Sequence, residues 1–215
     1  MAMPKIISDE MKIIKDDYGL DLAYELIAIG AHVGSSDYVD IHDNYRTEGT
    51  HDKKIDYLYV DRSSGQAWII QAYVSEDWEK PNPKLNKVSD LSNALTHAFE
   101  TDLANLHEDV RDPIRDLRQD ILDGIIHTVE VCFLHNLKHN KDVDAELDSI
   151  EKQLQLHLGN IQPDTSQSLA YSANQISIDK VETFLTGRYN FLAIKDEVVL
   201  TASAPVQSVD AEKWQ

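Results

Sequence analysis

Two strand-forming runs separated by a turn constrain the fold of this chain more than any other feature of its sequence. Residues 55–60 alternate polar and apolar side chains and are rich in aromatic residues, and residues 67–74 form a second β-forming run. The residues between them, 62–66 with the sequence RSSGQ, are typical of a turn. The pattern therefore predicts a β-hairpin, against which the other elements must pack.

Helical patterns surround this hairpin, and apolar residues recur at helical spacing in four stretches. These stretches are residues 8–33 with a break at Gly19, 87–100 with Asn86 as N-cap, 102–122, and 143–158 ended by Gly159. Further strands are predicted at 128–134, 169–178 and 198–202, a short helix at 181–185, and a loop at 35–54. This order favours an α/β fold, with a mixed sheet flanked by helices. We expect one domain over residues 1–202 and a tail or the start of a linker over 203–215.

Charge and composition narrow the classes of protein to which this chain can belong. The formal net charge of −18 disfavours tight nonspecific binding of nucleic acid by this chain alone, because such binding normally uses a basic face. A site of clustered carboxylates for a divalent cation stays compatible with that charge. No apolar run has the length of a membrane helix, the N-terminus lacks a signal-peptide pattern, and Cys132 is the single cysteine. These features predict a cytoplasmic protein without membrane contact.

Polar side chains inside the predicted hairpin are the features that point to chemistry. Asp56 enters the first strand, and Gln71 interrupts the apolar run of the second, where an amide has no obvious use. Neighbouring strands would bring the two side chains together, and their oxygens could hold a divalent cation. An Asp that binds local backbone amides and a hydrogen-bonded core amide are the ordinary structural alternatives, and both stay open at this point.

The same stretch resembles the PD-(D/E)xK nuclease superfamily, in which an acidic residue on one strand precedes E-x-K or Q-x-K on the next. Tyr73 stands in the lysine position of Q-x-K here. The sequences DW at 77–78 and NKVSDL at 86–91 are similar to those of the abortive infection phage resistance (AIPR) family. Its members pair a Q-x-Y strand end with an Asp-Trp loop and an N-K-x-S-D-L helix start. The resemblance covers roughly residues 20–100.

The resemblance implies a restriction-endonuclease-like fold and an enzyme that hydrolyses phosphodiester bonds in DNA or RNA with Mg²⁺ or Mn²⁺. It also implies a role in antiphage defence and a longer full-length protein with an additional C-terminal domain. The implied metal ligands are Asp56, Glu25, Gln71 and Asp52. The implied catalytic residues are Asp56, Gln71, Glu25 and Lys87, which would replace the missing lysine from the following helix, with Lys84 and Lys80 as alternatives.

Glu25 is also a candidate site residue independently of the family resemblance. It lies within the apolar stretch 22–29, where a carboxylate without a partner is energetically unfavourable. A different interpretation is that the fold has lost catalysis and serves as an acidic protein-interaction module. The replacement of the usual lysine by Tyr73 would then reflect that loss. A homo-oligomer is compatible with either interpretation. The nine histidines show no recognised zinc-ligand spacing, and Cys132 is expected to be a buried structural thiol.

Overall fold

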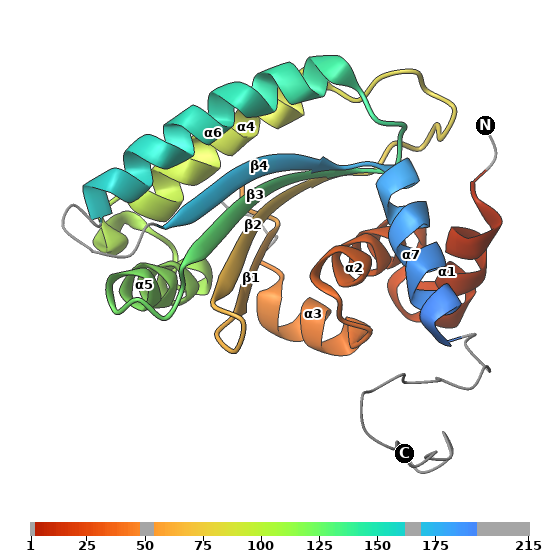
Figure 1. The fold of residues 1–215 in the computed structure, drawn as a ribbon, viewed down its shortest axis with the longest axis horizontal. Helices are drawn as coiled ribbons and strands as arrows, with labels where there is room; N and C mark the ends of the chain where they lie inside the picture. Colours follow the sequence, from red (N-terminus) through yellow and green to blue (C-terminus); the bar gives the residue numbers. More distant parts are fainter. Residues whose placement is uncertain (1–2, 48–53, 162–168, 193–215) are drawn as a thin grey trace, which may run out of the picture.

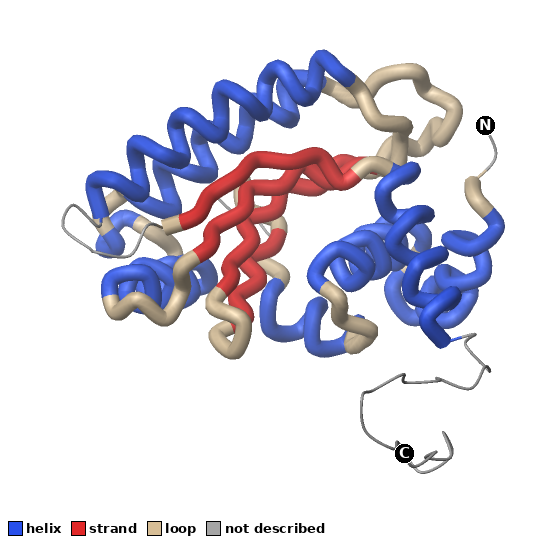
Figure 2. Tube along the Cα trace, in the orientation of Figure 1, coloured by secondary structure: helices blue, strands red, loops and turns tan. Residues whose placement is uncertain are grey.

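The computed structural model describes residues 3–47, 54–161 and 169–192. Within these residues the chain forms a mixed α/β structure, as predicted, with one sheet and helices on both of its faces (Figures 1 and 2). The helices are α1 (Lys5–Tyr18), α2 (Leu20–Val33), α3 (Tyr38–Tyr45), α4 (Leu85–Phe99), the short 3₁₀ helix η1 (Leu103–Asn105), α5 (Glu108–Leu122), α6 (Lys141–Ile161) and α7 (Ile178–Leu192). None of these helices is long and apolar enough to cross a membrane.

The four described strands are β1 (Tyr57–Asp61), β2 (Gln66–Tyr73), β3 (Thr128–His135) and β4 (Ala170–Ile176), and they lie side by side in that order. β1 and β2 form the predicted hairpin, with Tyr57 opposite Ile70. β3 and β4 then add in parallel, because α4 and α5 connect β2 to β3 and α6 connects β3 to β4. Helical crossovers of this kind are what parallel neighbours require.

The two faces of the sheet carry separate apolar cores. α4 and α6 run side by side over one face, whereas α1, α2, α3 and α7 lie on the other (Figure 1). Successive strand residues alternate between the faces, so Ile69 and Phe133 pack under α4 and α6 while Ile70 and Cys132 pack against the N-terminal helices. The expected burial of Cys132 is confirmed.

Glycines with positive φ divide the N-terminal helices. Gly19 has a φ of 77° and separates α1 from α2, which confirms the predicted break. Gly34 ends α2 in the left-handed conformation, with a φ of 80°. Both positions favour glycine because a β-carbon disfavours that region of backbone space.

Several predicted boundaries are wrong. Part of the predicted loop 35–54 is helix α3, which begins after Asp37, whose side chain accepts the N–H of Asp40 at 2.9 Å. Gly159 lies inside α6 instead of ending it, and α4 begins after Lys84, so Asn86 is not its N-cap. α7 is much longer than the predicted helix 181–185. The predicted strand 198–202 and the tail 203–215 lie outside the described residues.

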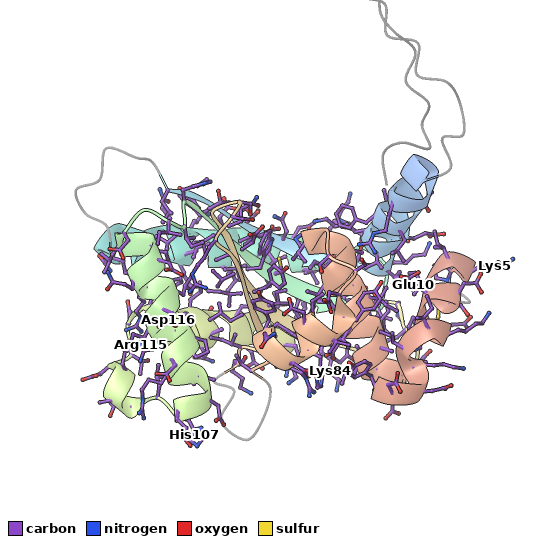
Figure 3. The ribbon with its side chains drawn as sticks, turned by 90° about the horizontal axis from the view of Figure 1, so that it is seen from below. Lys5, Glu10, Lys84, His107, Arg115 and Asp116 are labelled. Carbon is purple, nitrogen blue, oxygen red and sulfur yellow. The ribbon has the colours of Figure 1, made fainter. Side chains whose placement is uncertain are left out.

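The arginines of α5 do not share one role. Arg115 lies on the exposed face, where it pairs with Asp112 at 2.6 Å and Asp116 at 2.9 Å (Figure 3). Arg111 and Arg118 instead donate to backbone carbonyls of η1 and its surroundings and of the end of α4. Two of the three arginines therefore join elements together.

Two helical glycines should respond oppositely to substitution by alanine. A β-carbon on Gly30 of α2 would lie 2.6 Å from the backbone oxygen of Ser35, whereas one on Gly159 of α6 meets no atom of the described residues within 4 Å. We expect Gly30→Ala to lower the free energy of unfolding by about 1–3 kcal/mol. Gly159→Ala should raise it by up to about 1 kcal/mol through helix propensity. Urea denaturation of both variants measures the two changes, and a gain in stability at Gly30 would contradict the close approach.

Candidate metal site at the β1–β2 hairpin

The hairpin brings Asp56 and Gln71 into direct contact. Asp56 immediately precedes β1, and its backbone N–H donates to the Ile70 carbonyl at 3.0 Å, which sets it beside Gln71. The Gln71 amide donates to Oδ2 of Asp56. The backbone N–H of Ala72 donates to the same oxygen at 2.6 Å. The Asp56 carboxylate therefore binds the side chain of Gln71 and the backbone N–H of Ala72, both on β2, at the point where β1 begins.

Gln71 retains an unused acceptor in a buried position. Its side chain is 4% exposed, and its Oε1 atom has no hydrogen-bond partner among the residues that the structure describes. Asp56 beside it is 8% exposed. A buried polar atom left without a partner costs about 1–3 kcal/mol. A divalent cation held by oxygen atoms would remove that cost, so the residues present fit such an ion.

Glu25 contributes a second carboxylate from α2. Its Oε2 accepts a hydrogen bond from the Tyr57 hydroxyl at 2.8 Å. Burial raises the pKa of Glu25 to about 7, a rise that the Tyr57 hydrogen bond opposes and the negative charge of Asp56 increases. Two carboxylates that repel one another in a buried place are typical of metal-binding or catalytic sites. Glu25 therefore lies near enough to Asp56 for their charges to interact, and its role as a metal ligand stays a prediction.

Arg46 and Tyr57 lie around Glu25, although no sequence pattern singled out either residue. Arg46 follows α3 and pairs with Tyr57 through an isolated backbone bridge at the outer edge of β1. Its positive charge lowers the pKa of Glu25. Arg46 lies in a stretch that the sequence predicts to be a loop, and the alternation along residues 55–60 predicts Tyr57 only as a strand residue.

Two lysines gather at Tyr73, which stands in the lysine position of the Q-x-K pattern. The Lys80 ammonium donates to the Tyr73 hydroxyl at 3.2 Å. Lys80 and Lys84 lie 5.7 Å and 5.6 Å from the centre of its ring; Lys84 is labelled in Figure 3. Burial alone would raise the pKa of Tyr73, but the lysines and Ser75 outweigh it and hold that pKa below its ordinary value. Tyr73 is two residues from Gln71 on one face of β2, a separation of about 7 Å.

Lys87 lies in the first turn of α4 and pairs there with Asp90, at 3.8 Å from its Oδ2 atom. The ammonium of Lys54, two residues before Asp56, lies 3.6 Å from the same oxygen. Asp90 therefore links the start of α4 to the segment that leads into the site. A catalytic role of Lys87 stays a prediction. Asp52, the remaining predicted ligand, lies outside the described residues.

The raised pKa of Glu25 predicts a pH-dependent stability for the metal-free protein. Between pH 4.5, the ordinary pKa of this carboxyl group, and about pH 7, Glu25 is protonated more in the folded state than in the unfolded state. The contribution of Glu25 to the free energy of unfolding is therefore fully present below pH 4.5 and is lost as the pH rises through about 7. The loss is of the order of 3 kcal/mol.

Glu25→Gln should remove this contribution, whereas Glu182→Gln, at an exposed position of α7, should not. Urea denaturation with a chelator on either side of this pH window measures both. An unchanged pH profile in Glu25→Gln would mean that folding does not shift this pKa. Mn²⁺ should bind more tightly at the higher pH, because it needs the ionised carboxylate.

Comparison of the chain with protein-family models, with curated proteins and with solved structures gives no match. The interpretation of this site therefore depends on its own geometry and on the motifs at 56–91.

Proposed function

We propose that this chain is a metal-dependent nuclease domain that hydrolyses phosphodiester bonds in DNA or RNA, of the PD-(D/E)xK type and akin to AIPR proteins of antiphage defence. The observation that carries the proposal is the buried Oε1 atom of Gln71, which has no hydrogen-bond partner in the described part of the chain and lies beside the carboxylate of Asp56. The β1–β2 hairpin and the residue that leads into it hold both groups, and the negative charge of Asp56 raises the pKa of Glu25. Such a donor set, made of oxygen atoms only, suits Mg²⁺ or Mn²⁺.

Each residue of the hairpin site would have its own role in metal-dependent hydrolysis. Asp56 and Gln71 would hold the ion, with Glu25 as a further ligand in its ionised form. A bound divalent cation would polarise a phosphoryl oxygen and lower the pKa of a water molecule. The Tyr57 hydroxyl keeps Glu25 in place, and the positive charge of Arg46 moderates the rise of its pKa. Asp56 also fixes the end of β2 through the N–H of Ala72, so the site is anchored to the sheet.

Positive charge for the phosphate would come from the lysines around Tyr73. Lys80 and Lys84 both lie against that side chain, near the position that the lysine of Q-x-K occupies in the superfamily. A cation at this place offsets the charge that develops on phosphate oxygens during hydrolysis. Lys87 in the adjoining first turn is the further candidate for this role. These lysines would give a chain of net charge −18 a local anion-binding surface.

An inactive protein-interaction module is the alternative, and two observations favour it. Tyr73 replaces the usual lysine, and Asp56 already has a structural role as the acceptor of a β2 backbone N–H. This alternative predicts no stabilisation by Mn²⁺. It also predicts that Asp56→Asn is at least as stable as the wild-type protein, because removing one carboxylate relieves repulsion with Glu25.

The test combines metal binding with cleavage. End-labelled single-stranded and duplex DNA and RNA are incubated with the purified chain and Mn²⁺, Mg²⁺ or chelator, and the melting temperature is measured under the same conditions. We expect Mn²⁺ to raise the melting temperature and to support cleavage of at least one substrate. A melting temperature insensitive to Mn²⁺, together with intact substrates, would favour the inactive module.

A further inference from the structure

A second group of metal-ligating side chains lies on the sheet face opposite Gln71. It consists of His32 in the last turn of α2 and of Glu130 and Cys132 on β3. One ligand atom from each residue lies within 4.8 Å of the others. His32 and Glu130 are largely buried, and Cys132 is fully buried. We call these three residues the β3 cluster.

The distances within the β3 cluster match the edges of a tetrahedron. Nε2 of His32 lies 3.2 Å from Oε2 of Glu130 and 3.7 Å from Sγ of Cys132. Zinc bonds of about 2.0 Å to nitrogen or oxygen and about 2.3 Å to sulfur, at tetrahedral angles, put N and O about 3.3 Å apart and N and S about 3.5 Å apart. The two separations from Nε2 of His32 therefore already match those of a zinc site, and the carboxylate and the thiol lie within 4.8 Å of one another.

The same contacts disfavour a nucleophilic relay. In a Cys–His–acid relay the thiol and the carboxylate approach opposite nitrogens of the imidazole ring. Here both approach Nε2 of His32, and the buried Nδ1 atom has no hydrogen-bond partner among the described residues. Burial also raises the pKa of the Cys132 thiol well above its ordinary value, which disfavours a free thiolate nucleophile. A metal ion would stabilise the thiolate directly.

Further hydrogen bonds hold the carboxylate in position. Trp68 Nε1 donates to Oε2 of Glu130 at 2.9 Å, and Asn174 Nδ2 donates to Oε1 at 2.8 Å. Burial alone would raise the pKa of Glu130, but His32 and Asn174 help to lower it to about 2, so the group is ionised. Partners that orient a ligand in this way are a regular part of metal sites.

We propose that His32, Glu130 and Cys132 bind one Zn²⁺ ion through Nε2, a carboxylate oxygen and Sγ. On binding, the thiol proton of Cys132 leaves to solvent and the imidazole proton resides on Nδ1. The carboxylate and the thiolate together balance the charge of the ion. No fourth His, Cys, Asp or Glu joins the cluster among the described residues, so a water molecule or an exogenous ligand takes the fourth position.

The β3 cluster is distinct from the hairpin site in place and in chemistry. Ile70 and Cys132 share one face of the sheet, whereas Gln71 faces the other way. Glu130 is level with Trp68, three residues from Gln71 along β2, a separation of about 10 Å. Sulfur and nitrogen donors select Zn²⁺, whereas the oxygen donors of the hairpin site suit Mg²⁺ or Mn²⁺.

Cobalt substitution tests this proposal directly, because Cys132 is the only cysteine in the chain. The full chain is stripped with a chelator and titrated with Co²⁺, and the near-ultraviolet absorption is recorded. We expect a sulfur-to-cobalt charge-transfer band that saturates at one equivalent and disappears when Zn²⁺ displaces Co²⁺. The absence of this band in the folded protein would overturn the proposal.

Variants identify the ligands. Cys132→Ser should abolish the band, and His32→Gln and Glu130→Gln should each weaken Zn²⁺ binding by about 100-fold or more, since even outer partners of metal ligands contribute 10–100-fold. Asp61→Asn, at the exposed turn between β1 and β2, should leave Zn²⁺ affinity unchanged. If Cys132→Ser does not fold, the Zn²⁺ affinities of His32→Gln and Glu130→Gln test the proposal. Unchanged Zn²⁺ affinity in folded His32→Gln and Glu130→Gln would overturn the proposal.

Discussion

Asp56→Asn should lower Mn²⁺-dependent cleavage of nucleic acid about 1000-fold or more, while the protein stays folded. The substitution removes the negative charge that would hold the ion. It keeps a side-chain oxygen that can accept the N–H of Ala72, which Asp56 accepts at 2.6 Å. Loss of activity without loss of structure is therefore the expected result. Cleavage rates at saturating Mn²⁺ and the melting temperature without metal measure the two effects separately.

The matched control is Asp61→Asn at the other end of β1, where the carboxylate binds Ser63 and Ser64 in the exposed turn. This variant should cleave at the wild-type rate, because its carboxylate serves the turn only. Cleavage by Asp56→Asn at a rate similar to that of Asp61→Asn would remove Asp56 from the catalytic site. It would leave the carboxylate with its structural role at the end of β2.

Replacing the lysines around Tyr73 should produce the second largest effect. Lys80→Met and Lys84→Met should each lower kcat about 10–100-fold with little change in Mn²⁺ affinity, because the ammonium groups act on the phosphate. Lys80 should show the greater loss, since its ammonium also binds the Tyr73 hydroxyl at 3.2 Å. Methionine retains most of the apolar stem that packs on the ring.

Lys87→Met tests the prediction that the lysine migrated to the helix, and Lys12→Met on α1 is an exposed control. A greater loss of kcat in Lys87→Met than in either loop variant would assign the catalytic cation to α4. The lysines at Tyr73 would then be packing partners of that ring. Equal activity in all four variants would exclude a lysine from catalysis at this site.

Local patterns in the sequence predicted the hairpin, the break at Gly19 and the mixed sheet flanked by helices. Alternation along 55–60 and 67–74 reports burial on a sheet, and this signal needs no information from distant residues. Asp56 and Gln71 could be paired because a tight turn fixes the register of the two strands. Helix α3 was not predicted because it is short and lies in a stretch rich in polar residues, so its helical form depends on packing of Tyr38 and Ile41 against neighbours.

The sequence by itself determined the hairpin and the two polar side chains that it brings together, since both follow from neighbours in the chain. Only the tertiary structure decided the rest of the chemistry. Lys80 and Lys84 reach Tyr73 through the path of a proline-containing loop, and Arg46 reaches Tyr57 through the folding of α3 beside β1. His32 and Cys132 meet across 100 residues of sequence. Contacts between distant segments depend on how helices pack on a sheet, and a local pattern does not record that packing.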